Sequence, residues 1–408
     1  MPRLWLSEAA IFCNDRPEKY FPKGRVMSAL VADWGAGQDS EQHPPVLKRD
    51  GTPLKVLYAL DSFPQLSESY INAEIQRMQG WGVHIEVWSR GEPKSQAQCD
   101  VLVHRGTLLE TIERVKPDVV HTHWTQTALK YKDAAKRMGI PLTARGHWHF
   151  VPKQIARVER EPTIERLYML PHLANKWGSA TSKILPMVSC FHPEWLAPRV
   201  EKNRKMIVRT AACKQPKDLA TFIRIASRLP EYRAVLILCS LGPNDHYREL
   251  EQINRDLGSP VEMVHDITYE EVAAYLSEAG IYVHTYDPTV SFGMPVSIAE
   301  AMAAGCTVVA RNVEGADEYI GEAGRLYASE DEAVALIKAC EGWSDAEWAK
   351  ADEISRERAF RLFDDRKVLL PLLETWKQIA GEQAEAANSN VSLLTKFRRW
   401  SGIGYRRI

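Results

Sequence analysis

From Leu54 onward, short runs of apolar residues alternate with segments in which apolar residues recur every three or four positions. Leu54–Leu60 is a nearly unbroken apolar run and predicts a buried strand. Glu68–Gln79 places Ile71, Ile75 and Met78 on one face and predicts an amphipathic helix. Because strand–helix alternation of this kind needs crossover connections, we expect parallel strands that are buried on both faces.

The alternation continues in two series separated by an irregular connection between Pro171 and about Asn203, which contains several prolines. The first series adds strands at His84–Trp88, Val101–His104, Asp118–Trp124 and Ile140–Ala144 and a helix over Ala128–Met138. The second has strands at Met206–Ala211, Ala234–Cys239, Val261–Asp266, Ile281–Thr285 and Thr307–Ala310, with helices over Asp218–Arg228 and Tyr269–Ser277. The fold class is therefore α/β, with two doubly wound Rossmann-like domains whose ligands bind beyond the carboxyl ends of the strands.

The pattern divides the chain into four parts: an irregular N-terminal arm at 1–53, two Rossmann-like domains at 54–200 and 201–360, and C-terminal helices with a basic tail at 361–408. The arm contains six prolines and no periodic element. The segment from Ser344 to Glu385 has the spacing of a helix throughout.

Composition excludes several classes of protein. The chain has 408 residues and a formal net charge of -1, so it shows no electrostatic footprint for nucleic acid. Its seven cysteines are scattered without Cys-x-x-Cys spacing, which argues against a disulfide framework or a zinc site. There is no secretory signal and no run of eighteen apolar residues, so we expect a cytoplasmic protein.

The strongest local motif is Ser291–Gly305, in which a loop with Gly293 leads into a helix that begins near Pro295. Backbone N–H groups at such a helix start suit a phosphate, because the helix dipole is positive there. Glu300 would follow in the helix, where its carboxylate suits two ribose hydroxyls. The alternative reading is a solvated helix glutamate.

This stretch resembles the signature of the family-4 glycosyltransferases of the GT-B fold, and Glu300–Ala310 matches it almost position for position. The resemblance implies two facing domains, with 54–200 on the acceptor side and 201–360 binding a nucleotide sugar. It implies that Glu300 binds the ribose and that Gly293, Met294 and Pro295 form the donor loop. Leu54–Ile71 resembles the opening of exopolysaccharide-biosynthesis members, so polysaccharide or glycoconjugate synthesis is the expected role.

Two segments of the first domain carry further candidates. Ser67 and Glu68 lie between the first strand and helix, where a cap of the helix by Ser67 and a contact with acceptor or phosphate are both open. His147 aligns with a family histidine that contacts the donor sugar, so it is a catalytic candidate together with Glu300. His149 is a weaker neighbour, and we expect a structural role for His121 and His123, which share one face of a strand.

In the second domain, Lys217 opens a helix as the family's diphosphate-binding lysine does. A lysine there is unfavourable for the dipole unless an anion binds. The family's arginine five residues earlier is Ala212, so Arg209 or Lys214 is expected to supply that charge. A family glutamate that contacts the transferred sugar is Phe292 here, with Asp287 as a substitute from the loop. Gly315 is expected to start a helix, and Glu318 to be structural.

The resulting prediction is a retaining, hexosyltransferase-like enzyme that moves a sugar from a nucleotide-diphosphate sugar to a hydroxyl of a glycan or lipid-linked acceptor. The chain has no Asp-x-Asp, so no metal and no cofactor beyond the nucleotide sugar are expected. The departures at Phe292 and Ala212 leave a non-catalytic nucleotide-sugar-binding protein as the alternative. A nucleotide-sugar epimerase is disfavoured by the signature, and a dehydrogenase by the absence of glycine between Leu60 and Ser69.

The C-terminal tail suggests a separate contact. Lys396, Arg398 and Arg399 are interleaved with Phe397 and Trp400, a pattern that suits an anionic membrane surface. Peripheral association with the inner face of the membrane is the hypothesis, and a solvated tail is its alternative.

Overall fold

The computed structural model describes residues 45–48, 51–94, 100–147, 152–177, 183–239, 244–290, 292–293 and 295–382. These residues belong to one compact unit, Pro44–Ile408. Most of the predicted arm, the basic tail, His149 and Met294 lie outside the described residues.

The first sheet has seven parallel strands in the order β3-β2-β1-β4-β5-β6-β7. Its central strands are buried on both faces, which explains the unbroken apolar run Val56–Leu60 of β1. The order reverses between β1 and β4, which places a ligand crevice beyond their carboxyl ends. The strands are β1 (Lys55–Ser62), β2 (His84–Gly91), β3 (Leu102–His104), β4 (Val119–His123), β5 (Leu142–Arg145), β6 (Ile164–Met169) and β7 (Ile184–Pro186).

The first half also contains elements that the sequence pattern did not predict. The helix α6 (Pro171–Trp177) and the strand β7 lie in the segment between Pro171 and Asn203, so the prediction of an irregular connection there was wrong. Both elements are too short to show a period, and a proline begins one and ends the other. The other helices are α2 (Ser69–Gly80), α3 (Leu108–Val115), α4 (Thr125–Met138) and α5 (Pro152–Arg160).

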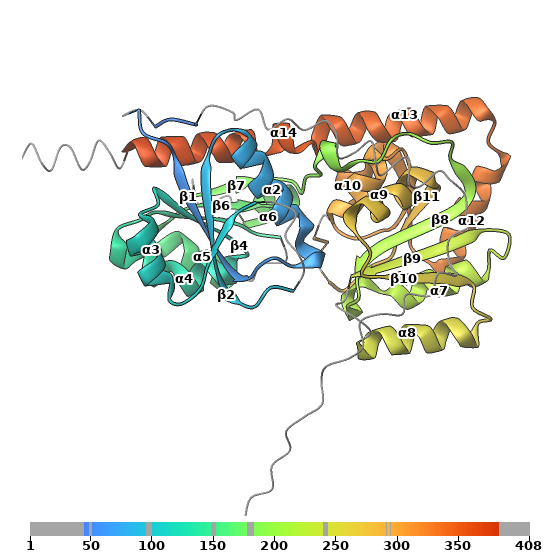
Figure 1. Cartoon of the computed structure of the whole chain (residues 1–408). Coiled ribbons are helices and arrows are strands. Elements are labelled where there is room, and N and C mark those ends of the chain that lie inside the picture. The colour runs from blue at the N-terminus through green and yellow to red at the C-terminus, as the bar shows by residue number, and fades with distance from the viewer. Residues whose placement is uncertain are drawn as a thin grey trace, which may run out of the picture. The chain divides into compact units, whose positions relative to one another are not determined.

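The second sheet has six parallel strands in the order β10-β9-β8-β11-β12-β13, with the switch point between β8 and β11 (Figure 1). Its strands are β8 (Asn203–Ala212), β9 (Arg233–Cys239), β10 (Val261–His265), β11 (Ala279–His284), β12 (Thr307–Arg311) and β13 (Gly324–Tyr327). Its helices are α7 (Leu219–Ser227), α8 (Asp245–Asp256), α9 (Tyr269–Glu278), α10 (Val296–Ala303), α11 (Ala316–Ile320) and α12 (Glu330–Ala339).

The C-terminal helices connect the two sheets. The helix α13 (Asp345–Leu362) packs against α10, and a bridge between Phe191 and Asp364 precedes the short helix α14 (Asp365–Val368). Residues 370–382 are helical, and their apolar side chains, Trp376 among them, belong to the core of the first sheet (Figure 1). The predicted helical C-terminal segment is confirmed, and it completes the first domain.

Candidate active site

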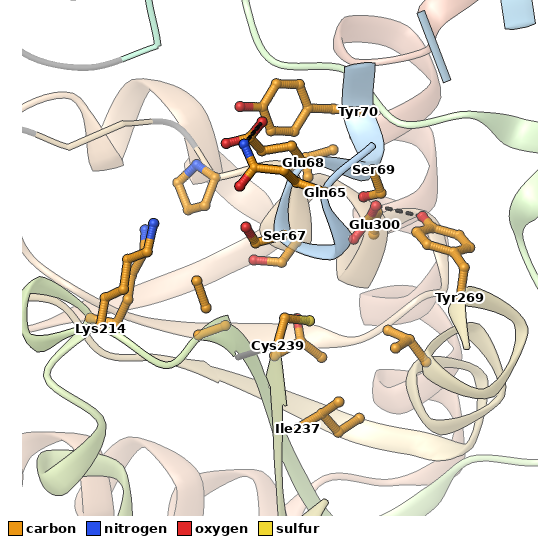
Figure 2. Close-up of a pocket in the computed structure, with 18 of the residues that line it drawn as sticks. Gln65, Ser67, Glu68, Ser69, Tyr70, Lys214, Ile237, Cys239, Tyr269 and Glu300 are labelled. Carbon is orange, nitrogen blue, oxygen red and sulfur yellow. Dashed lines mark hydrogen bonds between the residues drawn. The ribbon is translucent and has the colours of Figure 1, made fainter. Parts of the chain in front are cut away.

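A cavity of about 870 Å³ is lined by residues that follow strands of both sheets. From the first half come η1 (Leu66–Glu68), the start of α2, and His147 after β5. From the second come the ends of β8 and β9, the loops after β10 and β11, and the start of α10. Figure 2 shows Ser67 and Glu68 on one side and Lys214, Cys239 and Tyr269 on the other. The carboxyl ends of both sheets therefore open onto one cavity, as two Rossmann-like domains require.

Glu300 lies in this cavity on α10, with 6% of its surface exposed. The Tyr269 hydroxyl at the start of α9 donates a hydrogen bond to Glu300 Oε1 at 2.5 Å (Figure 2). Burial raises the pKa of Glu300 to about 7, although the bond from Tyr269 acts in the opposite direction. A buried carboxylate with one donor has capacity for further hydrogen bonds, so Glu300 is suited to accept them from a polar ligand.

Arg209 and Lys217 place positive charge in the lining of the same cavity. Arg209 is 1% exposed, and its guanidinium donates to the Thr210 and Thr285 carbonyls and to the Tyr282 hydroxyl, while its Nε has no partner. Lys217 Nζ lies 5.0 Å from the centroid of the Tyr286 ring. Among the described residues, neither cation forms an ion pair with a carboxylate. Buried charge without a counter-ion is costly, so this wall of the cavity is built for an anion.

The pKa of Lys217 reflects its buried and positively charged surroundings. Burial, together with the nearby charges of Arg209 and Lys214, lowers its pKa to about 7. Lys217 ends η3 (Gln215–Lys217), and α7 begins two residues later, so it precedes the helix that it was predicted to open. Lys214 also lines the cavity, where Ala212 replaces the family's arginine.

The loop before α10 brings the two halves into close approach. Gly293 and Pro295 line the cavity, and Pro295 is the N-cap of α10. A Cβ atom on Gly293 would lie only 3.1 Å from the His147 carbonyl oxygen. Glycine therefore allows the loop before α10 to pack closely against the first domain.

Ser67 and Glu68 line the opposite wall. Of the two alternatives left open for Ser67, the structure excludes the helix cap: Ser67 lies inside η1, and Glu68 occupies the N-cap position without a side-chain cap. A 3₁₀ turn extends the entry to the helix and moves the cap by one residue. Burial raises the pKa of Glu68 to about 7, against the opposing influence of Lys214 and Lys94. Gln65 Nε2 donates to Glu68 Oε2 at 2.9 Å.

His147 reaches the cavity, and its Nε2 lies 2.6 Å from Nδ1 of His123. Burial holds the pKa of His147 well below its usual range, and the charges of His123 and Arg145 act in the same direction. His121 and His123 are fully buried, in agreement with the expected structural role. Sequence reasoning missed their partners Glu74 and Arg145, whose types and spacing gave no signal.

Phe292 and Asp287, the two positions considered for contact with the transferred sugar, are not among the residues that line the cavity. Phe292 is 1% exposed and packs against Tyr319 with ring centroids 5.8 Å apart. Asp287 accepts hydrogen bonds from the backbone and hydroxyl of Thr289 and does not line the cavity. Glu318 also lies away from the cavity, on α11, which begins after Gly315 at φ 89° as predicted.

Two groups of side chains have spacing that would suit a metal ion: Glu74 with His121 and His123, and His192 with Glu194 and Asp365. An arginine already pairs with carboxylates of each group, Arg145 with Glu74 and Arg77 with Glu194 and Asp365. These guanidinium charges oppose a divalent cation. Among the described helices, none is long and apolar enough to cross a membrane.

Comparison with known proteins gives two sequence matches. Residues 204–344 match the family model of the group 1 glycosyl transferases. A GDP-Man:Man(3)GlcNAc(2)-PP-Dol alpha-1,2-mannosyltransferase from Xenopus laevis is 32% identical over 167 residues, which cover 37% of this chain and 34% of that protein. The chain thus matches about a third of the length of this curated relative.

Solved structures extend the likeness to both domains. A sucrose-phosphate synthase from Thermosynechococcus elongatus has a TM-score of 0.65 at 16% identity, covering 80% of this chain and 99% of its own. A glycosyltransferase from Rickettsia africae also has a TM-score of 0.65, at 14% identity with the same coverage. HepE from Anabaena, solved with UDP and glucose, has a TM-score of 0.64 at 16% identity, covering 79% and 99%. The solved structures confirm the predicted fold, and the match over residues 204–344 confirms the predicted resemblance to glycosyltransferases.

Proposed function

We propose that this chain, which has the GT-B fold and matches the group 1 glycosyl transferases over residues 204–344, transfers a sugar from a nucleotide-diphosphate sugar to a hydroxyl. The acceptor is a glycan or a lipid-linked glycan, within polysaccharide or glycoconjugate biosynthesis. The observation that carries the proposal is the pair Arg209 and Lys217, which have no carboxylate partner among the described residues and share a cavity with Glu300.

The donor fits the second wall of this cavity. The diphosphate lies against Lys217 and the positive end of α10. The buried positive charge of Arg209 adds to the electrostatic attraction for the diphosphate. Glu300 accepts hydrogen bonds from the ribose hydroxyls. HepE was solved with UDP and glucose and the Xenopus relative is named for GDP-mannose, so these two donors are the first to test.

The chemistry is transfer with retention of the anomeric configuration. The acceptor hydroxyl attacks from the face that the diphosphate leaves, and the departing phosphate oxygen takes its proton. Lys217 and backbone N–H groups stabilise the charge on the leaving group without a metal, which is electrostatic preorganisation. His147 positions the reacting sugar from the opposite wall.

Turnover of the donor tests this proposal. We expect release of UDP from UDP-glucose or of GDP from GDP-mannose, unchanged by EDTA and abolished by Glu300→Ala. The sugar product, followed by NMR, is expected to keep the anomeric configuration of the donor. An inverted product contradicts the mechanism, and loss of turnover with EDTA contradicts metal independence.

A non-catalytic binding protein is the second candidate, because Phe292 is buried where the family has a carboxylate. It predicts that UDP-glucose or GDP-mannose binds in a Glu300-dependent manner and is recovered intact after prolonged incubation with a panel of acceptors.

The basic tail supplies the proposed contact with a membrane-delivered acceptor. Full-length protein is expected to pellet with anionic liposomes, and a chain ending at Asn390 is expected to pellet less. Equal pelleting of the two proteins contradicts this contact.

A further inference from the structure

His147 and His123 form an end-to-end pair. His123 Nδ1 lies 2.6 Å from His147 Nε2, the ring centroids are 4.9 Å apart, and the ring planes differ by 1°. Two coplanar rings whose nitrogens are this close share one in-plane hydrogen bond. The orientation of His147 at the cavity wall is therefore set by a buried residue of β4.

The other ring nitrogen of His123 contacts the buried carboxylate of Glu74. His123 Nε2 lies 3.2 Å from Glu74 Oε1, which also accepts from the Tyr58 hydroxyl at 2.9 Å. Arg145 forms an ion pair with the other carboxylate oxygen. Burial alone would raise the pKa of Glu74, but the charge of Arg145 and the contacts with His123 hold it well below its usual range. Glu74 is thus ionised and can only accept hydrogen bonds.

Because the Glu74 carboxylate can only accept hydrogen bonds, it determines which ring nitrogens of His123 and His147 carry protons. His123 must donate from Nε2, so in its neutral form its Nδ1 accepts. His147 must then donate from Nε2, which leaves its Nδ1 with a lone pair. We infer that Glu74 and His123 are positioning residues that hold His147 in one neutral tautomer, with Nδ1 as a hydrogen-bond acceptor for a hydroxyl of the bound substrate.

The surroundings of His147 support this role. Its ring is flanked by Tyr70, with centroids 4.8 Å apart, and by Trp124 at 5.9 Å. Among the described residues, no hydrogen bond is made to its Nδ1, and His147 lines the cavity. The inference rests on the proposed function for the identity of the hydroxyl, which belongs to the donor sugar or to the acceptor.

A matched set of variants at two neighbouring histidines tests the inference. His123→Phe keeps a ring and removes the bond to His147, whereas His123→Asn offers an amide oxygen near the position of Nδ1. His121→Phe is the control, because His121 is equally buried and lies 3.3 Å from Glu74 Oε1 but bonds to Thr143 instead of His147. The proteins are labelled with ¹⁵N-histidine, and the His147 signals are assigned with His147→Gln.

Wild-type and His121→Phe proteins are expected to show neutral His147 protonated at Nε2, and His123→Phe a mixture of tautomers. With UDP-glucose or GDP-mannose as donor, His123→Phe is expected to lower kcat about 100-fold with little change in KM, because misorientation of a reacting group costs about that factor. His123→Asn is expected to restore at least a tenth of wild-type kcat.

Each contrary result is distinct. Wild-type His147 that is cationic or protonated at Nδ1 overturns the inference even where a variant fails to fold. Equal losses of kcat in His121→Phe and His123→Phe also overturn it, because they indicate a structural role shared by both histidines. Absence of donor binding and turnover in the wild type contradicts the proposed function instead, and leaves the tautomer measurable.

Discussion

The guanidinium of Arg209 on β8 lies 2.7 Å from the hydroxyl of Tyr282 on the neighbouring strand β11. Its other acceptors are the carbonyl oxygens of Thr210 and Thr285, so every partner that holds Arg209 is neutral. Hydrogen bonds to neutral oxygens fix the guanidinium without cancelling its charge. The field of Arg209 therefore remains for a ligand, and it contributes to the lowered pKa of Lys217.

Lys217→Met should weaken nucleotide binding and spare the fold. A hydrogen bond to a charged group contributes about 1.5–3 kcal/mol, so we expect affinity for UDP or GDP to fall about 10- to 100-fold by calorimetry. The unliganded variant is expected to be at least as stable as wild type, because a desolvated charge is removed. Lys350→Met, at an exposed lysine of α13, is the control. Unchanged affinity in Lys217→Met would remove this residue from the donor site.

Binding of an intact nucleotide sugar should be strongest near pH 7. The Lys217 pKa is lowered to about 7, so its charge and its attraction for the diphosphate are lost as pH rises above that value. The Glu300 pKa is raised to about 7, so the carboxylate that accepts from the ribose is lost as pH falls below it. Dissociation constants from pH 5.5 to 8.5 should form a bell whose acid limb disappears in Glu300→Gln. Affinity that is flat across this range counts against both assignments.

Gly293→Ala should slow turnover without unfolding the protein. The new Cβ would lie 3.1 Å from the His147 carbonyl oxygen, so the donor loop or the histidine segment must shift by a few tenths of an ångström. We expect kcat to fall about 10-fold, since small displacements near the reacting groups are costly. Gly342→Ala, whose Cβ meets nothing within 4 Å, should retain wild-type kcat. Equal kcat values for the two variants would show that the close approach is unimportant.

Trp376→Ala should destabilise the first domain through its C-terminal helix. Trp376 is fully buried, and its indole donates to Thr143 Oγ1 at 3.0 Å. Loss of a buried tryptophan costs about 3–5 kcal/mol of unfolding free energy, measured by urea denaturation. Leu370→Ala, at a 46% exposed position, should change it by less than about 0.5 kcal/mol. A cost at Trp376 as small as that at Leu370 would mean that the helix does not stabilise the first domain.

The strands and helices around the site were predictable because each is marked by a local pattern of apolar residues in the sequence. The run Val56–Leu60 of β1 is apolar without interruption, β8 contains the apolar run Met206–Val208, and α2 has a clear apolar face. The return of residues 370–382 to the first sheet was not predictable, since an apolar helical face does not identify the surface that it covers. The strand β7 was not predictable for a different reason: it is three residues long and ends in Pro186, so it is too short to show a pattern.

Within the site, motif residues were easier to predict than their partners. Glu300 and Lys217 stand at fixed distances from a loop and a strand end, and both line the cavity. Glu74 looks like any glutamate of an amphipathic helix, and its contacts with His123 and Arg145 join positions 49 and 71 residues apart. Such contacts depend on strand order, which the sequence pattern left open.

The most direct test of the central claim is a thermal shift with UDP and GDP, with and without EDTA, comparing wild type with Glu300→Ala. A nucleotide at about a hundred times its dissociation constant adds about 2.7 kcal/mol to the unfolding free energy. We predict that at least one of the two raises the melting temperature of the wild type, that EDTA does not reduce the shift, and that Glu300→Ala loses it. If neither nucleotide shifts the wild-type protein, or if Glu300→Ala shifts equally, the cavity is not a donor site and the account is contradicted.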